Sequence, residues 1–293
     1  MSLRGLHANL ACVWEATARK PGNVHRFKDF SDTHYLDFVA SAAAIAPVMA
    51  EAGQLSVGEI LTRGQAMTRL VTRRNTNLGI LLLLAPLAKA EAGSDYQAHV
   101  EEVLASLTPE DAEAAYAVIR SAQAGGLGEV PEADVREKPT VSLRDAMRLA
   151  ASRDMVARQY ATGFTEVFAE LAPALLDGIE RTGSLEGGIV VAHLAMMAAH
   201  PDSLIARKRG IAEARQAAQM AQRVVDLAWP DTYEAIRQLE QLDAWLRAEG
   251  HARNPGTTAD LLAAGLFVLL RQGRLHPGKH PWEQPRGLAG VSS

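Results

Sequence analysis

Helix-start signals recur along the whole chain, and no segment shows the sustained period-two alternation of a half-buried strand. Three residue pairs have the spacing of a capping box: Ser56 with Glu59, Thr108 with Asp111, and Ser142 with Asp145. Hydrophobic residues make up 48% of the 293 residues but aromatic ones only 5%, a balance that favours helix over strand. We therefore predict an all-α protein.

The three pairs predict helices from 57 to about 73, from 109 to a stop at Gly125 and Gly126, and from 143 to about 171. The last is expected to be one long helix with an apolar face. Further helices are predicted over 188–200, 204–228 and 232–248. Residues 125–140, rich in Gly, Pro and charge, are predicted to form a loop.

Two segments are apolar around their whole circumference, residues 80–90 and 257–273. A helix of this kind is buried on all sides, so we expect both at the centre of a multi-helix bundle. One domain of this size can bury a full core. We expect a single all-α catalytic domain over residues 1–275 and an irregular, Pro- and Gly-rich tail over 276–293.

Polar residues lead into both buried helices. The first is preceded by RRNTNLG, which contributes Arg73, Arg74, Asn75, Thr76, Asn77 and Gly79. The first N–H groups of a helix lack internal partners and carry the positive end of its dipole, so these residues predict an anion site. An alternative is that Asn77 or Thr76 merely caps the helix and the arginines are solvated. At the second helix, Asp260 is either a site residue or only the cap partner of Thr257.

Three further clusters combine both signs of charge. Residues 15–38 contain Lys20, Arg26, Asp32 and Asp37, a density that suits a phosphate site with a divalent cation but also plain surface. Asp202 precedes a basic run that includes Arg207. Asp154 lies four residues before Arg158, and a surface ion pair on one helix would explain that spacing.

The net charge of −4 gives no general electrostatic reason to bind nucleic acid or an anionic membrane. The single cysteine, Cys12, excludes an internal disulfide, and no apolar run reaches the roughly 20 residues of a membrane span. We expect a cytoplasmic protein that binds neither nucleic acid nor membrane. The sequence leaves the oligomeric state open, a homodimer included.

Five blocks in order, KPGNVHR, FVASA, NTNLG, DSLIARKRG and NPGTTADLLAA, resemble the triphosphoribosyl-dephospho-coenzyme A synthase family. Members of that family are all-α enzymes that move the triphosphoribosyl unit of ATP onto dephospho-CoA and release adenine. The resemblance implies ATP as substrate, Mg²⁺ as cofactor, and a nucleotide and a small cofactor precursor as partners. His25 stands where the family has Asp, and Asn77 and Leu78 replace its His and Lys.

The resemblance suggests roles for the charged residues. Phosphates would be held by Lys20, Arg26, Arg73, Arg74 and Arg207, and Asn75 and Asn77 would orient the ribose or a phosphate. Mg²⁺ would bind Asp32 or Asp202. The candidate acids and bases are Asp32, Asp37, Asp154 and Asp260.

Two alternatives remain open at this stage. The departures at Asn77 and Leu78 are consistent with a divergent branch that serves a one-carbon carrier pathway, based on a pterin or a furan, with a different phosphorylated substrate. They are also consistent with a helical nucleotide-binding protein without catalysis.

Overall fold

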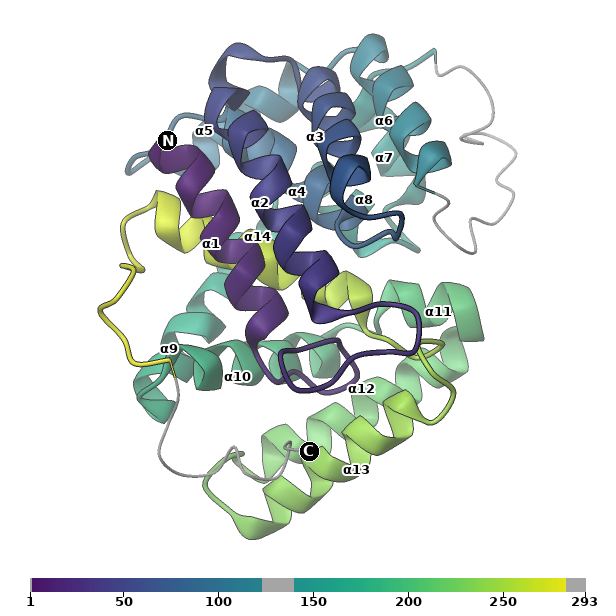
Figure 1. Cartoon of the computed structure of the whole chain (residues 1–293), viewed down its shortest axis with the longest axis vertical. Helices are drawn as coiled ribbons and strands as arrows, with labels where there is room; N and C mark the ends of the chain where they lie inside the picture. The colour runs from purple at the N-terminus through teal and green to yellow at the C-terminus, as the bar shows by residue number, and fades with distance from the viewer. Residues whose placement is uncertain (1, 123–139, 283–293) are drawn as a thin grey trace.

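The computed structural model describes residues 2–122 and 140–282, and it consists of helices joined by loops (Figure 1). Within these ranges it contains fourteen α-helices, one 3₁₀ turn and one π-helical turn, and no strand. The prediction of an all-α bundle is therefore confirmed.

The first six α-helices are α1 (Leu3–Thr17), α2 (Tyr35–Glu51), α3 (Val57–Val71), α4 (Leu78–Lys89), α5 (Tyr96–Ala105) and α6 (Pro109–Ser121), with the 3₁₀ turn Ala52–Gln54 after α2. Helix α1 packs against α2 and α14, and α3 packs against α2 and α6. The capping boxes predicted at Ser56 and at Thr108 are both present. Helix α6 ends at Ser121, and the stop predicted at Gly125 and Gly126, like most of the predicted loop, lies outside the described residues.

The long helix predicted over 143–171 is wrong. Ser142 caps α7 (Leu143–Ala150) as expected, but α8 (Met155–Thr162) then starts afresh, followed by a π-helical turn (Val167–Leu171) and α9 (Ala172–Thr182). The carboxylate of Asp154 accepts hydrogen bonds from the N–H groups of Val156 and Ala157, so it caps a new helix. Gly163, with φ of 69°, ends α8 in a left-handed conformation.

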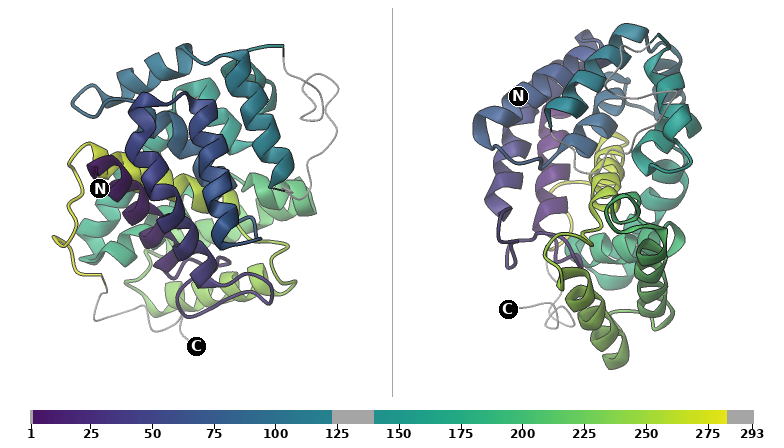
Figure 2. Two further views of the ribbon diagram at one scale, coloured as in Figure 1. Left: turned by 45° about the horizontal axis from the view of Figure 1, so that its top comes forward. Right: turned by 90° about the vertical axis from the view of Figure 1, so that its right-hand side faces the viewer.

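The last five helices are α10 (Leu185–Ala199), α11 (Ser203–Arg209), α12 (Ile211–Asp226), α13 (Tyr233–Arg247) and α14 (Gly256–Arg271). The single helix predicted over 204–228 is two helices, because Gly210 at φ of 90° breaks it. Helices α12 and α13 lie side by side at one end of the molecule (Figure 2).

Buried apolar side chains form two clusters. The larger surrounds α4 and α14, which are buried on nearly every face, as predicted for these two helices. The smaller lies between α10, α12 and α13. Helix α10 contributes Ile189 and Met196 to the first cluster and Val190 and Leu194 to the second. It is therefore apolar all round because it separates two cores.

Residues 276–282 are not helical and run back to the start of α10. The carbonyl oxygens of Pro281 and Trp282 accept hydrogen bonds from the N–H groups of Leu185 and Glu186. This part of the tail is irregular, as expected, but it binds two of the N–H groups that open a helix. The division into residues 1–275 and a tail stays a prediction.

Length and composition alone would allow one described helix, Tyr35–Gln54, or in addition the bent pair Leu185–Ala199 with Ser203–Arg209, to cross a membrane. Helix α2 packs against α1 and α3, and α10 separates the two cores. Core helices of soluble proteins pass the same test, so the finding is weak evidence for a membrane. The cytoplasmic location and the lack of membrane and nucleic-acid partners stay predictions.

Candidate functional site

The N-terminal ends of the two central helices, α4 and α14, meet inside the molecule. A Cβ atom added at Gly79, in the first turn of α4, would lie 2.0 Å from Oδ2 of Asp260, the fifth residue of α14. Any larger residue at position 79 would displace the carboxyl of Asp260. Helix α14 begins after Pro255 without a side-chain cap, so the alternative that Asp260 is the cap partner of Thr257 is wrong.

A cavity of about 930 Å³ opens at this meeting point. Ten of the residues that the sequence singled out line it, drawn from the α1–α2 loop, the α3–α4 loop, the start of α4, the α7–α8 turn, α11 and α14. They are Asp32, Arg73, Arg74, Asn75, Thr76, Asn77, Gly79, Asp154, Arg207 and Asp260.

Residues 73–79, here called the RNT segment, form the wall at the start of α4. The side chain of Asn75 accepts a hydrogen bond from Leu78 N–H at 3.2 Å, whereas Asn77 donates to Thr68 Oγ1 at 3.0 Å. Thr76 is hydrogen-bonded to Ser41 at 2.6 Å. Asn77 therefore occupies the N-cap position of α4, in line with the alternative raised for it, but its side chain makes no capping hydrogen bond, and the side chain of Asn75 binds a free N–H of the helix start instead.

Two amide N–H groups remain available at this helix start. Among the described residues, no acceptor binds the N–H of Gly79 or of Ile80, and both residues line the cavity. Arg73 has no ion pair or hydrogen bond within the described residues, and Arg74 lies 3.8 Å from a carboxylate oxygen of Asp32. A helix N-terminus beside two exposed arginines is a site for an anion.

The carboxyl group of Asp260 has no hydrogen bond or ion pair within the part of the chain that the structure describes. Burial is the main cause that raises its pKa well above the usual value for Asp, and the negative charges of Glu15, Asp202 and Asp154 raise it further. Arg207 opposes the shift. Such a setting favours the protonated form of the carboxyl, which is the form that can give a proton to a substrate.

The opposite wall is built on ion pairs. Asp154 lies 3.1 Å from Arg207 of α11, so a single carboxylate both caps α8 and holds this arginine at the cavity. Arg158 pairs with Glu166 instead, at 2.5 Å, which shows that the predicted surface pair of Asp154 with Arg158 is wrong. Asp32 pairs with His251 at 3.2 Å.

Asp202, which the sequence suggested as a metal ligand, is buried outside this cavity. Its Oδ1 accepts from the N–H groups of Leu204 and Ile205, and its Oδ2 accepts from the N–H and the hydroxyl of Thr258, both at 2.8 Å. The start of α14 is thus already occupied by an anion from within the protein. This placement favours a structural role, joining α11 to α14.

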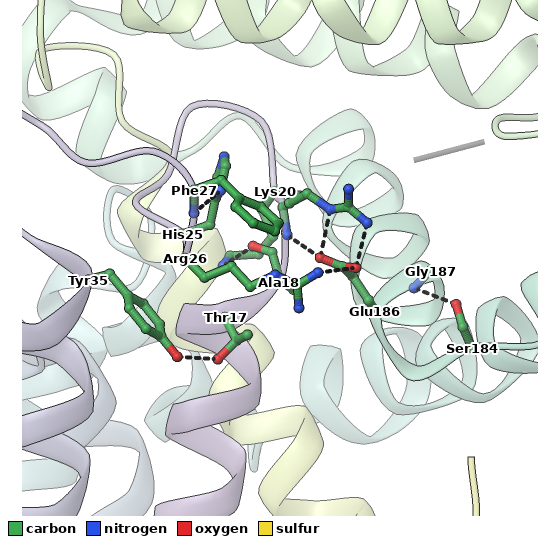
Figure 3. A network of polar contacts seen from close by, with 11 residues as sticks. Thr17, Ala18, Lys20, His25, Arg26, Phe27, Tyr35, Ser184, Glu186 and Gly187 are labelled. Carbon is green, nitrogen blue, oxygen red and sulfur yellow. Dashed lines mark hydrogen bonds and ion pairs between the residues drawn. The ribbon is translucent and has the colours of Figure 1, made fainter. Parts of the chain in front are cut away.

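Residues 20–28, here called the KPG segment, contain Lys20 and Arg26, which were predicted to bind phosphate but do not line the cavity. Figure 3 shows the network of polar contacts around these two residues. Lys20 is fully buried, and its ammonium group lies 3.0 Å from the carboxylate of Glu15. Arg26 lies 3.3 Å from Glu186 of α10, a carboxylate that Arg19 also binds, at 2.8 Å. The structure therefore does not favour a phosphate role for Lys20 or Arg26.

The same segment is tied to α13. The N–H of Gly22 and the ammonium group of Lys28 both donate to the carboxylate of Asp243, at 2.8 and 3.0 Å. Burial, followed by the charge of Arg247, lowers the pKa of His25 to about 3, so this ring is neutral. The segment acts as a junction between α1, α10 and α13.

Asp37, a candidate acid or base, is also outside the cavity wall. Its carboxylate accepts from the backbone N–H of His34 and from the hydroxyl of Thr72. It closes the capping box that opens α2 and fixes the end of α3 beside it. This arrangement does not favour a catalytic role.

Sequence reasoning missed several residues that line the cavity: Glu15, Arg153, Lys208, His251 and Asn254. Glu15 and Lys208 belong to clusters that the sequence did mark as charged. His251 and Asn254 lie in the connection between α13 and α14, and no local pattern distinguishes them from ordinary loop residues. A position inside the block NPGTTADLLAA is the one signal that was available for Asn254.

An all-α bundle whose inner cavity combines exposed arginines, an unoccupied helix N-terminus and a protonatable carboxyl defines a site for a phosphorylated substrate. The family model for ATP:dephospho-CoA triphosphoribosyl transferase matches residues 3–277, and the chain belongs to this family. It is a transferase of the triphosphoribosyl-dephospho-CoA synthase type, moving the triphosphoribosyl unit of ATP onto dephospho-CoA. Release of adenine is consistent with this family.

One solved structure is similar over most of its length. It is a candidate triphosphoribosyl-dephospho-CoA synthase from Archaeoglobus fulgidus, with a TM-score of 0.62 and 24% sequence identity. The match covers 80% of this chain and 99% of the other, and at this identity it supports the shared fold alone. No curated protein matches the chain.

Proposed function

We propose that the cavity between α4 and α14 is the active site for this transfer. The triphosphate of ATP binds at the start of α4, where the N–H groups of Gly79 and Ile80 are available and Arg73 and Arg74 add positive charge. Arg207, held by Asp154, contributes a third cation from the opposite wall. The ribose of ATP then lies next to Asp260.

The reaction is a substitution at the anomeric carbon of the ATP ribose. A hydroxyl oxygen of dephospho-CoA forms the new bond to this carbon, the bond to the adenine nitrogen breaks, and positive charge develops on the sugar. Asp260 in its protonated form gives its proton to the departing adenine. Asp154, as an anion, stabilises the positive charge that develops on the sugar. It then accepts the proton of the attacking hydroxyl.

A magnesium ion would bind at this site together with the phosphates of the substrate. Within residues 2–122 and 140–282, no group of three or more His, Cys, Asp or Glu side chains could hold a metal by itself. Mg²⁺ commonly binds one or two carboxylates together with substrate phosphates. Asp32 is the carboxylate placed to take part, since it lies beside Arg74 at the cavity, and the ion would neutralise phosphate charge.

The observation that carries the proposal is the unpaired carboxyl of Asp260 against Gly79, at a helix start that is free to bind an anion. The test is adenine release from ATP, measured with and without dephospho-CoA. We expect release to depend on dephospho-CoA and to fall about 100- to 10,000-fold in Asp260→Asn. Asp37→Asn, outside the cavity, is the control and should retain activity in its folded fraction. Full activity of Asp260→Asn would exclude this carboxyl as the acid.

A further inference from the structure

The cavity has two chemically different halves. One half is formed by α6, α7, α8 and the middle of α4, and its wall is apolar. Six residues define this apolar half: Leu82, Tyr116, Ile119, Met147, Ala150 and Val156. The polar half is formed by residues 73–77 and 207–208 together with His251 and Asn254, and it carries Arg73, Arg74 and Arg207. The α7–α8 turn, with Arg153 and Asp154, lies between them.

The apolar half cannot hold a triphosphate, because none of its six side chains is charged and a phosphate there would lose its hydration without a partner. At about 930 Å³, the whole cavity is near the upper end of the range for ligand sites, roughly 300–1,000 Å³. The space beyond the phosphate site is therefore suited to a part of a substrate that carries no charge.

Besides the ribose rings, which are tied to the phosphates, two parts of the substrates are uncharged, the adenine rings and the pantetheine arm of dephospho-CoA. Bases in protein sites stack on aromatic rings or on guanidinium planes. In the described cavity wall such a pair stands in the polar half, where Phe30 and His251 form an edge-to-face contact with ring centroids 5.9 Å apart. Of the six residues of the apolar half, only Tyr116 is aromatic.

The remaining five side chains are aliphatic or methionine, and Ala150 and Val156 are the shortest of them. Methionine adapts its shape to a flexible chain more readily than a branched side chain does. From this division, and on the basis of the proposed function, we infer that the apolar half binds the pantetheine arm of dephospho-CoA. The adenosine and the phosphates of both substrates then lie in the polar half.

This inference assigns acceptor specificity to Ile119 and Ala150, which are half-buried and partly face the cavity. The test compares binding of dephospho-CoA with binding of ADP, which has the adenosine and the diphosphate but no arm, by titration calorimetry of the full chain. Wild type should bind dephospho-CoA at least tenfold more tightly than ADP. In Ile119→Glu the ratio of the Kd for ADP to the Kd for dephospho-CoA should fall to within twofold of one, with ADP binding unchanged.

A second variant, Ala150→Phe, fills the apolar half without adding charge and should reduce the ratio in the same way. Ala117→Glu and Leu149→Glu, on exposed positions of the same two helices, are matched controls that should leave the ratio unchanged. An unchanged ratio in both Ile119→Glu and Ala150→Phe, or an equal loss of ADP binding, would overturn the inference.

The outcome is separable from that of the proposed function because no turnover is required. Adenine release with an unaltered ratio would refute the inference alone. A collapsed ratio without adenine release in wild type would refute the proposed chemistry alone. Failure of wild type to bind dephospho-CoA would overturn both.

Discussion

The KPG segment and the RNT segment are both short basic stretches that connect helices, yet their charges have opposite fates. In the KPG segment, Lys20, Arg26 and Lys28 each contact a carboxylate supplied by another part of the chain. In the RNT segment, Arg73 has no such partner among the described residues, and Arg74 has only a long contact with Asp32. Positive charge that the fold neutralises holds helices together, and positive charge that it leaves unmatched is available to a substrate.

The difference does not come from the cations themselves. Glu186 is fully buried at the start of α10, where it binds Arg19 and Arg26, and Asp243 reaches the KPG segment from α13. At the start of α4, within the described residues, the nearby carboxyl of Asp260 pairs with neither arginine, and Asp32 lies 3.8 Å from Arg74. The comparison predicts that changes in the KPG segment alter stability, whereas changes in the RNT segment alter substrate binding.

The largest effect should come from removing the buried carboxylate. Glu186→Ala leaves two arginines without their shared partner, and breaking a buried ion pair of this kind costs about 3–5 kcal/mol of unfolding free energy. Urea unfolding measures the change. Glu51→Ala, which removes an exposed partner of Arg63, is the control and should cost no more than about 0.5 kcal/mol. Equal losses in the two variants would contradict the distinction between the segments.

A smaller effect, on binding rather than on stability, is expected in the RNT segment. Arg73→Ala should raise KM for ATP about tenfold, or ~1.4 kcal/mol, because one charge-assisted contact to phosphate is lost. Its unfolding free energy should stay within about 0.5 kcal/mol of wild type. Arg69→Ala, an exposed arginine one turn earlier that does not line the cavity, should change neither quantity. If Arg73→Ala destabilised the fold without affecting KM, the comparison would fail.

A third effect concerns the pH dependence of stability. The pKa of Asp260 is raised above its unfolded value, so this residue contributes stability at acid pH that is lost as the pH rises through the folded-state pKa. In Asp260→Asn the unfolding free energy does not fall in this way, because the amide does not ionise. The variant should match wild type below the usual Asp range, about 3.9, and become relatively more stable towards neutral pH. Urea unfolding at several pH values provides the measurement, and a variant that loses stability relative to wild type as pH rises would show that the carboxylate is stabilised instead.

Part of this structure was predictable because the controlling interactions are local. Capping pairs lie three residues apart, so Ser56 and Thr108 marked true helix starts. All-round apolar composition correctly placed α4 and α14 at the centre. The long helix failed because Asp154, which an i, i+4 pattern assigned to Arg158, instead caps α8 and meets Arg207 about fifty positions further on.

By itself, the sequence determined the helical class, the central pair of helices and ten residues that line one cavity, since all of these follow from local patterns or from ordered blocks. Only the tertiary structure decided which charges are available. Arg26 and Arg73 look alike as isolated residues, but Glu186 lies beside one and no carboxylate pairs with the other within the described chain. The free energy of a charge depends on what surrounds it, and the surroundings come from segments far away in the sequence.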